Sequence, residues 1–298
     1  MVTSLYNKYR PQQLTDIVGQ EHIVTVLTNT INLNRYHHTY LFSGPKGTGK
    51  TSTARILAKA INCDGKNPPC NSCTVCIGIS QRTLNDVIEI DAASHRGVEN
   101  IEQIIHDAQF VPTFARKKVY ILDECHMLSN TAFNALLKTL EEQAKHIMFI
   151  LCTTTPEKMP ETVRSRCLHL SFKALSQSAI TTYLKYVCMK ENISYEEVAL
   201  KLLAYRATNS MRDAVVNLEV LGNSVTTDLV RKYDNMVDDR ILVKFVYALI
   251  TKNCKDALKI LNTHLTVKGG TVNELVRDAI DFTRLMLLLS IDEALLTD

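Results

Sequence analysis

The residues from Gly44 to Thr51 have the types and spacing of a phosphate-binding loop. They read Gly-Pro-Lys-Gly-Thr-Gly-Lys-Thr, which fits the pattern G-x-x-x-x-G-K-T. Glycines let backbone N–H groups close on phosphate oxygens, and a following helix adds the positive end of its dipole. We therefore predict that Lys50 reaches the β- and γ-phosphates of ATP and that the Thr51 hydroxyl binds Mg²⁺. The other predicted nucleotide contacts in this stretch are Gly44, Pro45, Lys46, Gly47, Thr48, Gly49 and Ser52.

The surroundings of this loop argue against a chance glycine-rich turn. Residues 40–42 are an apolar run that predicts a strand, and residues 51–61 carry helix formers without Gly or Pro. A strand, a glycine-rich turn and a helix, in that order, form the anion site used by P-loop proteins.

A pair of acids follows the apolar run 119–122, which predicts a buried strand. Open α/β sheets bind ligands at the carboxyl ends of their strands. We predict that Asp123 holds Mg²⁺ through its water shell and that Glu124 polarises an attacking water. The alternative is a solvated acidic turn. Asp123-Glu124-Cys125-His126 also fits the D-E-x-H box of helicases, but no second arginine-rich lobe follows, so we expect His126 only to neighbour the site.

Other side chains are weaker candidates on spacing alone. The hydroxyls of Thr153–Thr155 follow the apolar run 147–152 and could bond the γ-phosphate or the attacking water. Arg164, Arg166 and Arg212 could stabilise transition-state charge, although most arginines are surface charges.

Four cysteines lie within a short polar insert at residues 63–76. Cys63, Cys70, Cys73 and Cys76 have the spacing C-x6-C-x2-C-x2-C. Four thiolates suit tetrahedral Zn²⁺ and leave no position for water, so the predicted metal is structural. The alternative is a set of free thiols in a loop.

Composition bounds the class of protein. The chain has 298 residues, a net charge of +3, 46% hydrophobic residues and 22% charged residues. These values fit a globular chain with two domains or three small ones, and the charge permits a nucleic-acid surface without arguing for one. Apolar runs are too short to span a membrane, and the first ten residues lack the apolar core of a signal peptide, so we expect a cytoplasmic protein.

The order of predicted elements indicates an α/β fold followed by helices. Strands and helices alternate up to about residue 172, which predicts a parallel sheet covered on both faces. We expect a nucleotide-binding core at 1–172, a three-helix lid at 173–238 and a partial helical collar at 239–298. The lid helices are predicted at 176–190, 195–206 and 211–221.

Several segments together resemble one family, the gamma/tau subunits of bacterial DNA polymerase III, which are AAA+ clamp-loader ATPases. The matching segments are 9–11, 18–22, 37–44, 88–94, 133–142 and 165–167. A tetracysteine insert at this place is a mark of that family among AAA+ proteins. The resemblance is dense from about residue 5 to 172 and weak after about residue 225.

The resemblance implies roles for individual residues. Arg166 matches the arginine finger that enters the next subunit's ATP site, Thr154 the sensor-1 position, and Arg212 the sensor-2 arginine on the γ-phosphate of its own site. Val18 and Gly19 match the segment near the adenine. Lys138 and Arg96 match positions that face DNA phosphates.

The resemblance also implies a function and partners. We expect the motor subunit of the polymerase III clamp loader, within a DNA-directed DNA polymerase (a nucleotidyltransferase), at the replication fork near the nucleoid. The implied partners are other loader subunits in a hetero-oligomeric ring, a sliding clamp and primer-template DNA. The tail that binds polymerase and helicase in longer members is expected to be missing here, and the collar to be shortened.

Two other functions remain as alternatives. A non-hydrolysing scaffold subunit of the same ring would have lost the P-loop lysine or an acid, whereas Lys50, Thr51, Asp123 and Glu124 are all present. A translocating AAA+ helicase such as a branch-migration motor would have a DNA-binding winged helix after the lid and no zinc insert.

Overall fold

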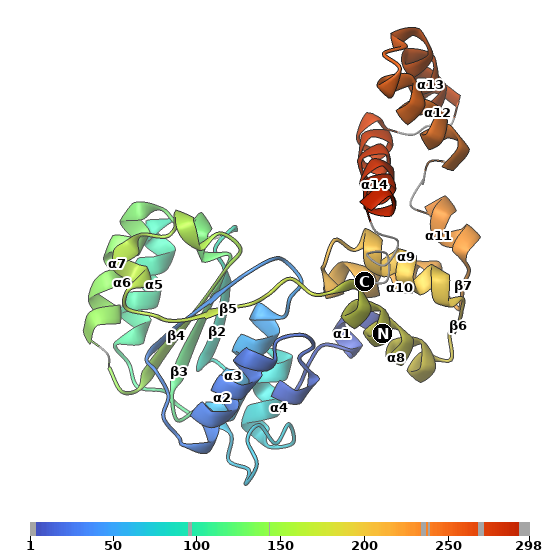
Figure 1. The fold of residues 1–298 in the computed structure, drawn as a ribbon. Helices are drawn as coiled ribbons and strands as arrows, with labels where there is room; N and C mark the ends of the chain where they lie inside the picture. The colour runs from blue at the N-terminus through green and yellow to red at the C-terminus, as the bar shows by residue number, and fades with distance from the viewer. Residues whose placement is uncertain are drawn as a thin grey trace. The chain divides into compact units, whose positions relative to one another are not determined.

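A parallel β-sheet with helices on both faces precedes a helical C-terminal part (Figure 1). The computed structural model describes residues 4–94, 97–142, 144–233, 237, 239–267 and 271–291. These residues form two compact units, the first within Met1–Val187 and Ala204–Glu219, the second within Cys188–Leu203 and Val220–Asp298. The functional division at residues 172 and 238 stays a prediction.

The five strands of the first unit's sheet all run parallel in the order β2-β3-β4-β1-β5. Their bounds are β1 Thr39–Ser43, β2 Val87–Asp91, β3 Lys118–Asp123, β4 Ile147–Thr153 and β5 Leu168–Ser171. The predicted α/β class with a parallel sheet is therefore confirmed. The order places β1, which leads into the P-loop, beside β4, and β4 beside the acid-bearing β3.

Successive side chains of β1 belong to different core clusters, one on each face of the sheet. Tyr40 and Phe42 belong to a core cluster with the apolar residues of α2 (Glu21–Asn32) and α3 (Lys50–Asn62), whereas Leu41 belongs to a cluster with those of α5 (Val98–Ala108) and α6 (Asn130–Glu142). Successive strand residues point to opposite faces, so one apolar run supplies both cores.

Helix α3 forms where the run of helix formers at residues 51–61 predicts a helix. Ser129 caps α6 by accepting a hydrogen bond from the Ala132 N–H at 3.2 Å. The remaining N-terminal elements are short, apart from α4, which begins inside the cysteine insert. The helix bounds are α1 Leu5–Lys8, η1 Leu14–Asp16, α2 Glu21–Asn32, α3 Lys50–Asn62, α4 Thr74–Gln81, α5 Val98–Ala108, η2 Cys125–Met127, α6 Asn130–Glu142, η3 Pro156–Lys158 and α7 Glu161–Arg164.

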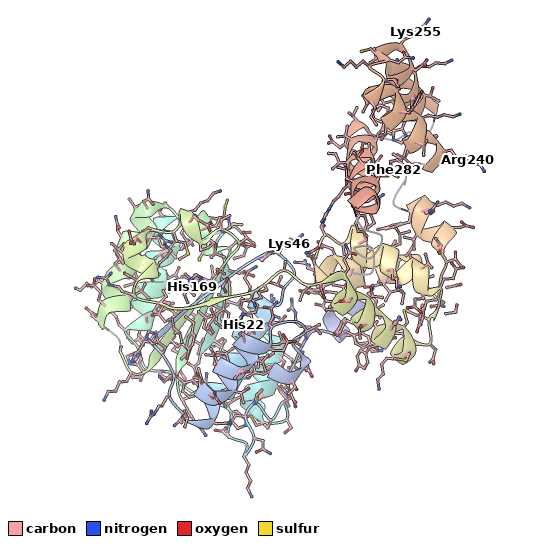
Figure 2. The ribbon with its side chains drawn as sticks, in the orientation of Figure 1. His22, Lys46, His169, Arg240, Lys255 and Phe282 are labelled. Carbon is pink, nitrogen blue, oxygen red and sulfur yellow. The ribbon has the colours of Figure 1, made fainter. Side chains whose placement is uncertain are left out.

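Strand β5 was not predicted, because four residues with one polar face give little signal. Side chains help to hold it against the sheet. The His169 Nε2 lies 2.7 Å from the Ser43 Oγ, and the His22 Nε2 lies 2.9 Å from the Ser171 carbonyl oxygen (Figure 2).

The predicted lid helices form α8, α9 and α10 within two residues of the expected bounds. In the second unit, α12, α13 and α14 share a core that includes Phe245 and Leu275, with Phe282 against it (Figure 2). The short helix α11 and the paired two-residue strands β6 and β7 were not predicted. The bounds are α8 Gln177–Glu191, β6 Ser194–Tyr195, α9 Glu197–Arg206, α10 Met211–Leu221, β7 Ser224–Val225, α11 Thr227–Tyr233, α12 Asp239–Ile250, α13 Cys254–Val267 and α14 Val272–Ile291.

Within the described residues, none of the helices combines the length and apolar character needed to cross a bilayer.

A buried carboxylate fixes the loop that leads into β3. Asp86 is 3% exposed, and its Oδ1 accepts a hydrogen bond from the Thr113 N–H at 2.9 Å. Its Oδ2 accepts from the Phe114 N–H at 2.7 Å and from the Ala115 N–H at 2.8 Å. Burial by itself raises the pKa of the Asp86 carboxyl, but the three N–H donors and the charge of Lys118 outweigh burial and hold that pKa below its ordinary value.

We predict that Asp86→Asn lowers the free energy of unfolding by about 1–3 kcal/mol, because an amide cannot accept all three hydrogen bonds. Because the folded-state pKa is depressed, the carboxylate's contribution is complete above the unfolded pKa of about 4 and is lost as the pH falls through the folded value. Urea unfolding between pH 3 and 7 should therefore show a smaller acid loss in the variant. Asp107→Asn, at a side chain that is 47% exposed, is the control. Equal stability of both variants at pH 7 would contradict the prediction.

Candidate nucleotide site

The loop between β1 and α3 has a backbone that only glycine fits at two positions. Gly44 has φ +140°, and a Cβ there would collide with the Phe172 carbonyl oxygen. Gly47 has φ +76°, and a Cβ there would collide with the Ser210 hydroxyl. Gly49 caps the N-terminus of α3 with φ 102°. The backbone N–H groups of the loop and the N-terminus of α3 can therefore lie close to a bound anion.

Lys50 begins α3 and is held against the loop. It is 5% exposed, and its Nζ donates hydrogen bonds to the carbonyl oxygens of Gly44 and Pro45, each at 2.8 Å. Burial lowers the pKa of the Lys50 ammonium, and the acidic groups of Glu124 and Asp123 partly oppose that shift. A buried cation in this position favours a polyanionic ligand.

The two predicted magnesium residues lie in direct contact. The Thr51 Oγ1 donates a hydrogen bond to the Asp123 Oδ2 at 2.7 Å, although the residues are far apart in sequence. A hydroxyl and a carboxylate are the hard oxygen donors that Mg²⁺ prefers, so this pair fits the metal chemically. The arrangement could hold Mg²⁺ beside the phosphates of a nucleotide.

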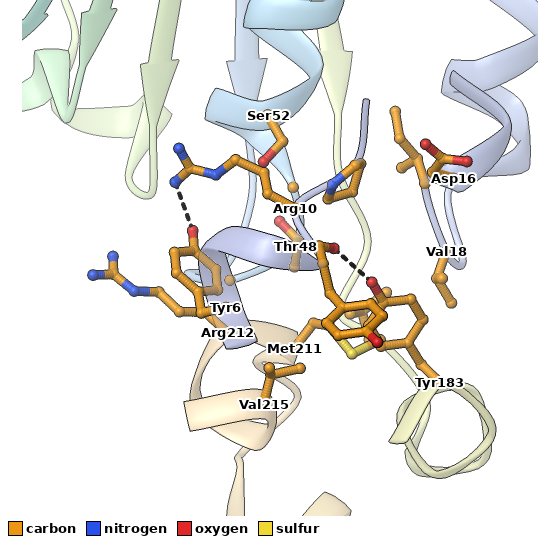
Figure 3. Close-up of a pocket in the computed structure, with 16 residues that line it drawn as sticks. Tyr6, Arg10, Asp16, Val18, Thr48, Ser52, Tyr183, Met211, Arg212 and Val215 are labelled. Carbon is orange, nitrogen blue, oxygen red and sulfur yellow. Dashed lines mark hydrogen bonds between the residues drawn. The ribbon is translucent and has the colours of Figure 1, made fainter. Parts of the chain in front are cut away.

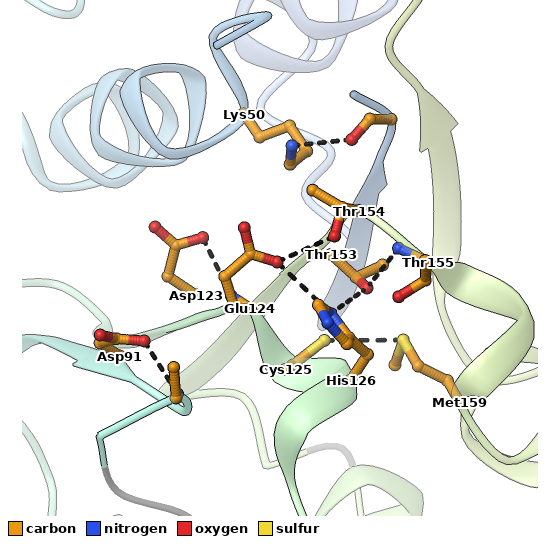
Figure 4. Close-up of polar contacts among 12 residues, drawn as sticks. Lys50, Asp91, Asp123, Glu124, Cys125, His126, Thr153, Thr154, Thr155 and Met159 are labelled. Carbon is orange, nitrogen blue, oxygen red and sulfur yellow. Dashed lines mark hydrogen bonds and ion pairs between the residues drawn. The ribbon is translucent and has the colours of Figure 1, made fainter. Parts of the chain in front are cut away.

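Glu124 lies at the centre of a polar network that β3 and β4 bring together (Figure 4). Its backbone is left-handed, with φ 48° and ψ 41°. Its Oε2 accepts a hydrogen bond from the Thr154 Oγ1 at 3.2 Å and lies 3.3 Å from the His126 Nδ1. The same His126 nitrogen lies 3.0 Å from the Thr153 Oγ1, so His126 neighbours the site as expected. Thr153 therefore helps to orient His126, although the sequence does not distinguish Thr153 from the two threonines that follow it.

Residues 211–213 at the start of α10 contact the P-loop and the N-terminal segment. The Met211 N–H donates to the Gly47 carbonyl oxygen at 3.2 Å, and the Arg212 guanidinium lies over the Tyr6 ring, 5.0 Å from its centroid (Figure 3). Lys46 faces Asp213 at 3.7 Å. This places Arg212 at the same cavity as the phosphate-binding loop.

The cavity beside the loop has a volume of about 70 Å³. This volume is below the about 300–1,000 Å³ that is typical of small-molecule sites. Its lining includes the predicted residues Val18, Gly47, Thr48, Gly49, Ser52 and Arg212. Gly19 is not among the lining residues of this cavity, and its backbone is left-handed, with φ +69°.

Other residues of this cavity were missed because they come from distant segments. The N-terminal segment supplies Tyr6, Tyr9, Arg10 and Pro11, and later helices supply Tyr183, Met211 and Val215. Only Tyr9-Arg10-Pro11 carried a signal, as one of the segments on which the family resemblance depends. No local pattern identifies Tyr6 or Tyr183.

The predicted arginine finger and the predicted DNA-contacting residues are not part of this site. Arg166 donates hydrogen bonds to the Thr162 carbonyl oxygen and to the Glu141 Oε1, both at 2.6 Å, and contacts no P-loop residue in the hydrogen bonds of the described chain. Lys138 lies exposed on α6, and Arg96 lies outside the described residues.

The four predicted cysteines form a cluster. The sulfurs of Cys63, Cys70, Cys73 and Cys76 lie within 4.8 Å of one another. Backbone N–H groups of residues 65, 70, 73 and 76 donate to the sulfurs of Cys63, Cys70 and Cys73 at 3.3–3.4 Å. Donors from Ser72 and Cys73 lower the pKa of Cys70 to about 5, which favours its thiolate. The cluster could hold one tetrahedral metal ion, and four sulfur donors suit Zn²⁺.

Comparisons with known proteins agree with one another. A family model described as "DNA polymerase III, delta subunit" matches residues 19–176, and one described as "DNA polymerase III clamp loader subunit, ATPase lid domain" matches residues 179–216. The chain is 44% identical to DNA polymerase III subunit tau of Bacillus subtilis, covering 96% of this chain and 52% of that protein. It is 43% identical to subunit tau of Escherichia coli, covering 87% and 41%.

A shorter relative is covered more fully. Subunit gamma of Buchnera aphidicola from Acyrthosiphon pisum is 42% identical, with 87% of this chain and 73% of that protein aligned. The chain spans about half or less of the tau subunits that it matches. Among solved structures, the RuvB Holliday junction branch migration motor of Thermotoga maritima aligns with a TM-score of 0.55 at 18% identity, covering 90% of this chain and 84% of that one. That likeness supports the P-loop AAA+ fold alone.

Proposed function

Since the chain belongs to the family of tau and gamma subunits of bacterial DNA polymerase III, we propose that it is the ATP-hydrolysing motor of a clamp loader. The observation that carries the proposal is the Thr51–Asp123 contact at 2.7 Å, with Lys50 and Glu124 beside it. All four side chains that a P-loop ATPase needs therefore meet at one edge of the sheet.

Within this proposal, each residue of the site has one role. The loop from Gly44 to Gly49 binds the phosphates with its N–H groups, and Lys50 balances their charge. Thr51 and Asp123 would hold Mg²⁺, which neutralises phosphate charge when bound. Glu124, oriented by Thr154 and His126, accepts a proton from the attacking water.

Arginines complete the proposed mechanism. Arg212 would bind the γ-phosphate of its own site from the lid, and Arg166 would act in the site of a neighbouring subunit. The exposure of Arg166, whose side chain is 37% accessible, fits a role outside its own chain. Movement of the lid would then couple binding of the γ-phosphate to the affinity for a sliding clamp.

The proposed partners are other loader subunits, a sliding clamp and primer-template DNA, with Lys138 and Arg96 toward the DNA phosphates. The structural ion would be Zn²⁺ at the four cysteines. The cytoplasm, where the chromosome is replicated, is the expected location and stays a prediction.

A translocating helicase remains the competing function. The clamp-loader proposal requires ATP turnover that is stimulated jointly by clamp and primed DNA. Unwinding of a branched substrate without that stimulation would overturn the proposal.

We predict that two P-loop site variants separate binding from hydrolysis. Lys50→Ala should weaken ATP binding by at least about 10-fold, because it removes a charge-assisted phosphate contact. Glu124→Gln should retain ATP binding and lower turnover by about 10²–10⁴-fold. Equilibrium binding and steady-state hydrolysis test both, with exposed Glu21→Gln as the control. Unchanged turnover in Glu124→Gln would remove the assigned base.

We predict that the arginine finger works between chains. Arg166→Ala in the assembled loader should keep ATP binding and lower stimulated turnover by about 10³-fold or more. Mixing Arg166→Ala with Lys50→Ala subunits should restore part of the turnover, because an intact P-loop then meets an intact Arg166 of the neighbour. Exposed Arg35→Ala is the control. Failure of the mixture to exceed the separate variants in rings shown to be mixed would contradict a role between chains.

We predict that the chain contains about one zinc per molecule and that Cys73→Ser loses it, since four thiolates are needed to close the site. Loss of zinc should lower the thermal midpoint of unfolding, because the insert loses the ion that closes it. Metal analysis and thermal unfolding test this, with exposed Cys254→Ser as the control. Full zinc content in Cys73→Ser would show that this sulfur is not a ligand.

A further inference from the structure

A second cavity in the first unit is lined by cations. Its volume is about 360 Å³, within the range of small-molecule sites. It is formed by the N-terminal segment, one side of α3 and the end of α4. The residues that line it are Asn7, Arg10, Pro11, Gln12, Ser52, Arg55, Ile56, Lys59, Ser80 and Arg82.

The charge around this cavity is unbalanced. Four side chains of its lining are cationic and none is acidic. The carboxylate in contact with them comes from Glu89 on β2, which accepts hydrogen bonds from Arg55 at 2.6 and 2.5 Å and from Arg82 at 3.1 Å. One carboxylate is thus shared by two guanidinium groups, so the cavity keeps an excess of positive charge.

Lys59 is the most buried of these cations. It is 2% exposed, and its Nζ donates to two neutral amide oxygens, the Gln12 Oε1 at 2.7 Å and the Asn71 Oδ1 at 3.1 Å. In the hydrogen bonds of the described residues, no carboxylate accepts from it. The acidic group that acts on its charge is the Cys76 thiol, so a second anion in the cavity would further offset the cost of burying this ammonium.

Arg10 contributes a buried N–H that lacks a hydrogen-bond acceptor among the described residues. Its Nη2 donates to the Tyr6 hydroxyl at 2.9 Å, while its Nε is buried and has no partner within the described chain. A ligand atom with lone pairs in this cavity would satisfy that N–H and offset the cost of burying it.

We propose that this cavity binds linked phosphate groups, in a site separate from the P-loop. Guanidinium forks and an ammonium are the donors that recognise phosphate oxygens, and three of them are arginines. The volume exceeds the needs of a single phosphate, so a diphosphate or triphosphate fits better. The source is either a free polyphosphate-bearing small molecule or the backbone of a nucleic acid. This site does not rest on the proposed ATPase function.

Occupancy of the site would influence the nucleotide cavity. The two cavities share Arg10, Pro11 and Ser52 in their linings. A phosphate bonded to Arg10 on one side and to Lys59 of α3 on the other would fix the N-terminal segment that also walls the nucleotide cavity.

The test measures tripolyphosphate binding to the full chain by calorimetry at low salt, with saturating ADP and Mg²⁺ to fill the P-loop. Arg82→Asn removes one cation, and Asn tolerates the left-handed backbone at φ 59°. The matched control is Arg116→Asn, because both arginines are 61% exposed and each pairs with one carboxylate. Lys59→Met, checked for folding by circular dichroism, is the second variant.

We expect saturable binding that Arg82→Asn weakens about 10-fold, as for a lost charge-assisted hydrogen bond, and that Arg116→Asn changes less than twofold. A single-stranded oligonucleotide is titrated in parallel. Arg82-dependent binding of tripolyphosphate identifies a small-molecule source, and Arg82-dependent binding of the oligonucleotide alone identifies a nucleic-acid source. If neither ligand binds with the P-loop filled, or if both arginine variants weaken binding equally, the phosphate site does not exist.

Discussion

The contact between the Thr51 hydroxyl and the Asp123 carboxylate is the constraint on which the candidate site depends. It joins the start of α3 to the carboxyl end of β3, two strands away from β1 in the sheet. In a parallel sheet the carboxyl ends of all strands lie at the same edge. The loop after β1 and the acids at the end of β3 therefore lie at one edge, and β4 sets the distance between their strands. β4 in turn ends at Thr153, which joins the same network through His126.

Much of this arrangement could be predicted from the sequence because its signals are local. The P-loop, the acid pair and the cysteine cluster are defined by residue types at fixed spacing, and the structure brings Thr51 into contact with Asp123 and the four cysteines into one cluster. The wall of the nucleotide cavity could not be predicted in the same way. Tyr6 meets Arg212 only through tertiary folding, and nothing near either residue in sequence indicates that contact. Strand β5 was missed because it has only four residues, of which His169 and Ser171 are polar, and the partner of His169 on β1, Ser43, is far away in sequence.

The buried lysine and asparagine side chains of helix α3 each have a hydrogen-bond partner. Eleven of its thirteen residues are buried, yet they include Lys50, Lys59 and Asn62. Each polar group has a specific partner: Lys50 bonds the P-loop, and Asn62 exchanges hydrogen bonds with the Lys117 backbone at 2.8 and 3.1 Å. Burial of polar groups is tolerated only where partners are fixed, so α3 is held in register along its whole length.

The same helix connects three sites that differ in chemistry. Its first turn borders the nucleotide cavity, Arg55 and Lys59 line the second cavity (the basic cavity), and its C-terminal cap is Cys63 of the cysteine cluster. Lys59 reaches Asn71 inside the cysteine insert, so the insert and the basic cavity share a side chain. A metal ion that fixes the insert would therefore also fix Lys59 and, through Gln12, the N-terminal segment beside the nucleotide. A metal ion at the cysteine cluster would therefore order more than the insert itself, because part-buried hydrogen bonds of Lys59 join the insert to the N-terminal segment that walls the nucleotide cavity.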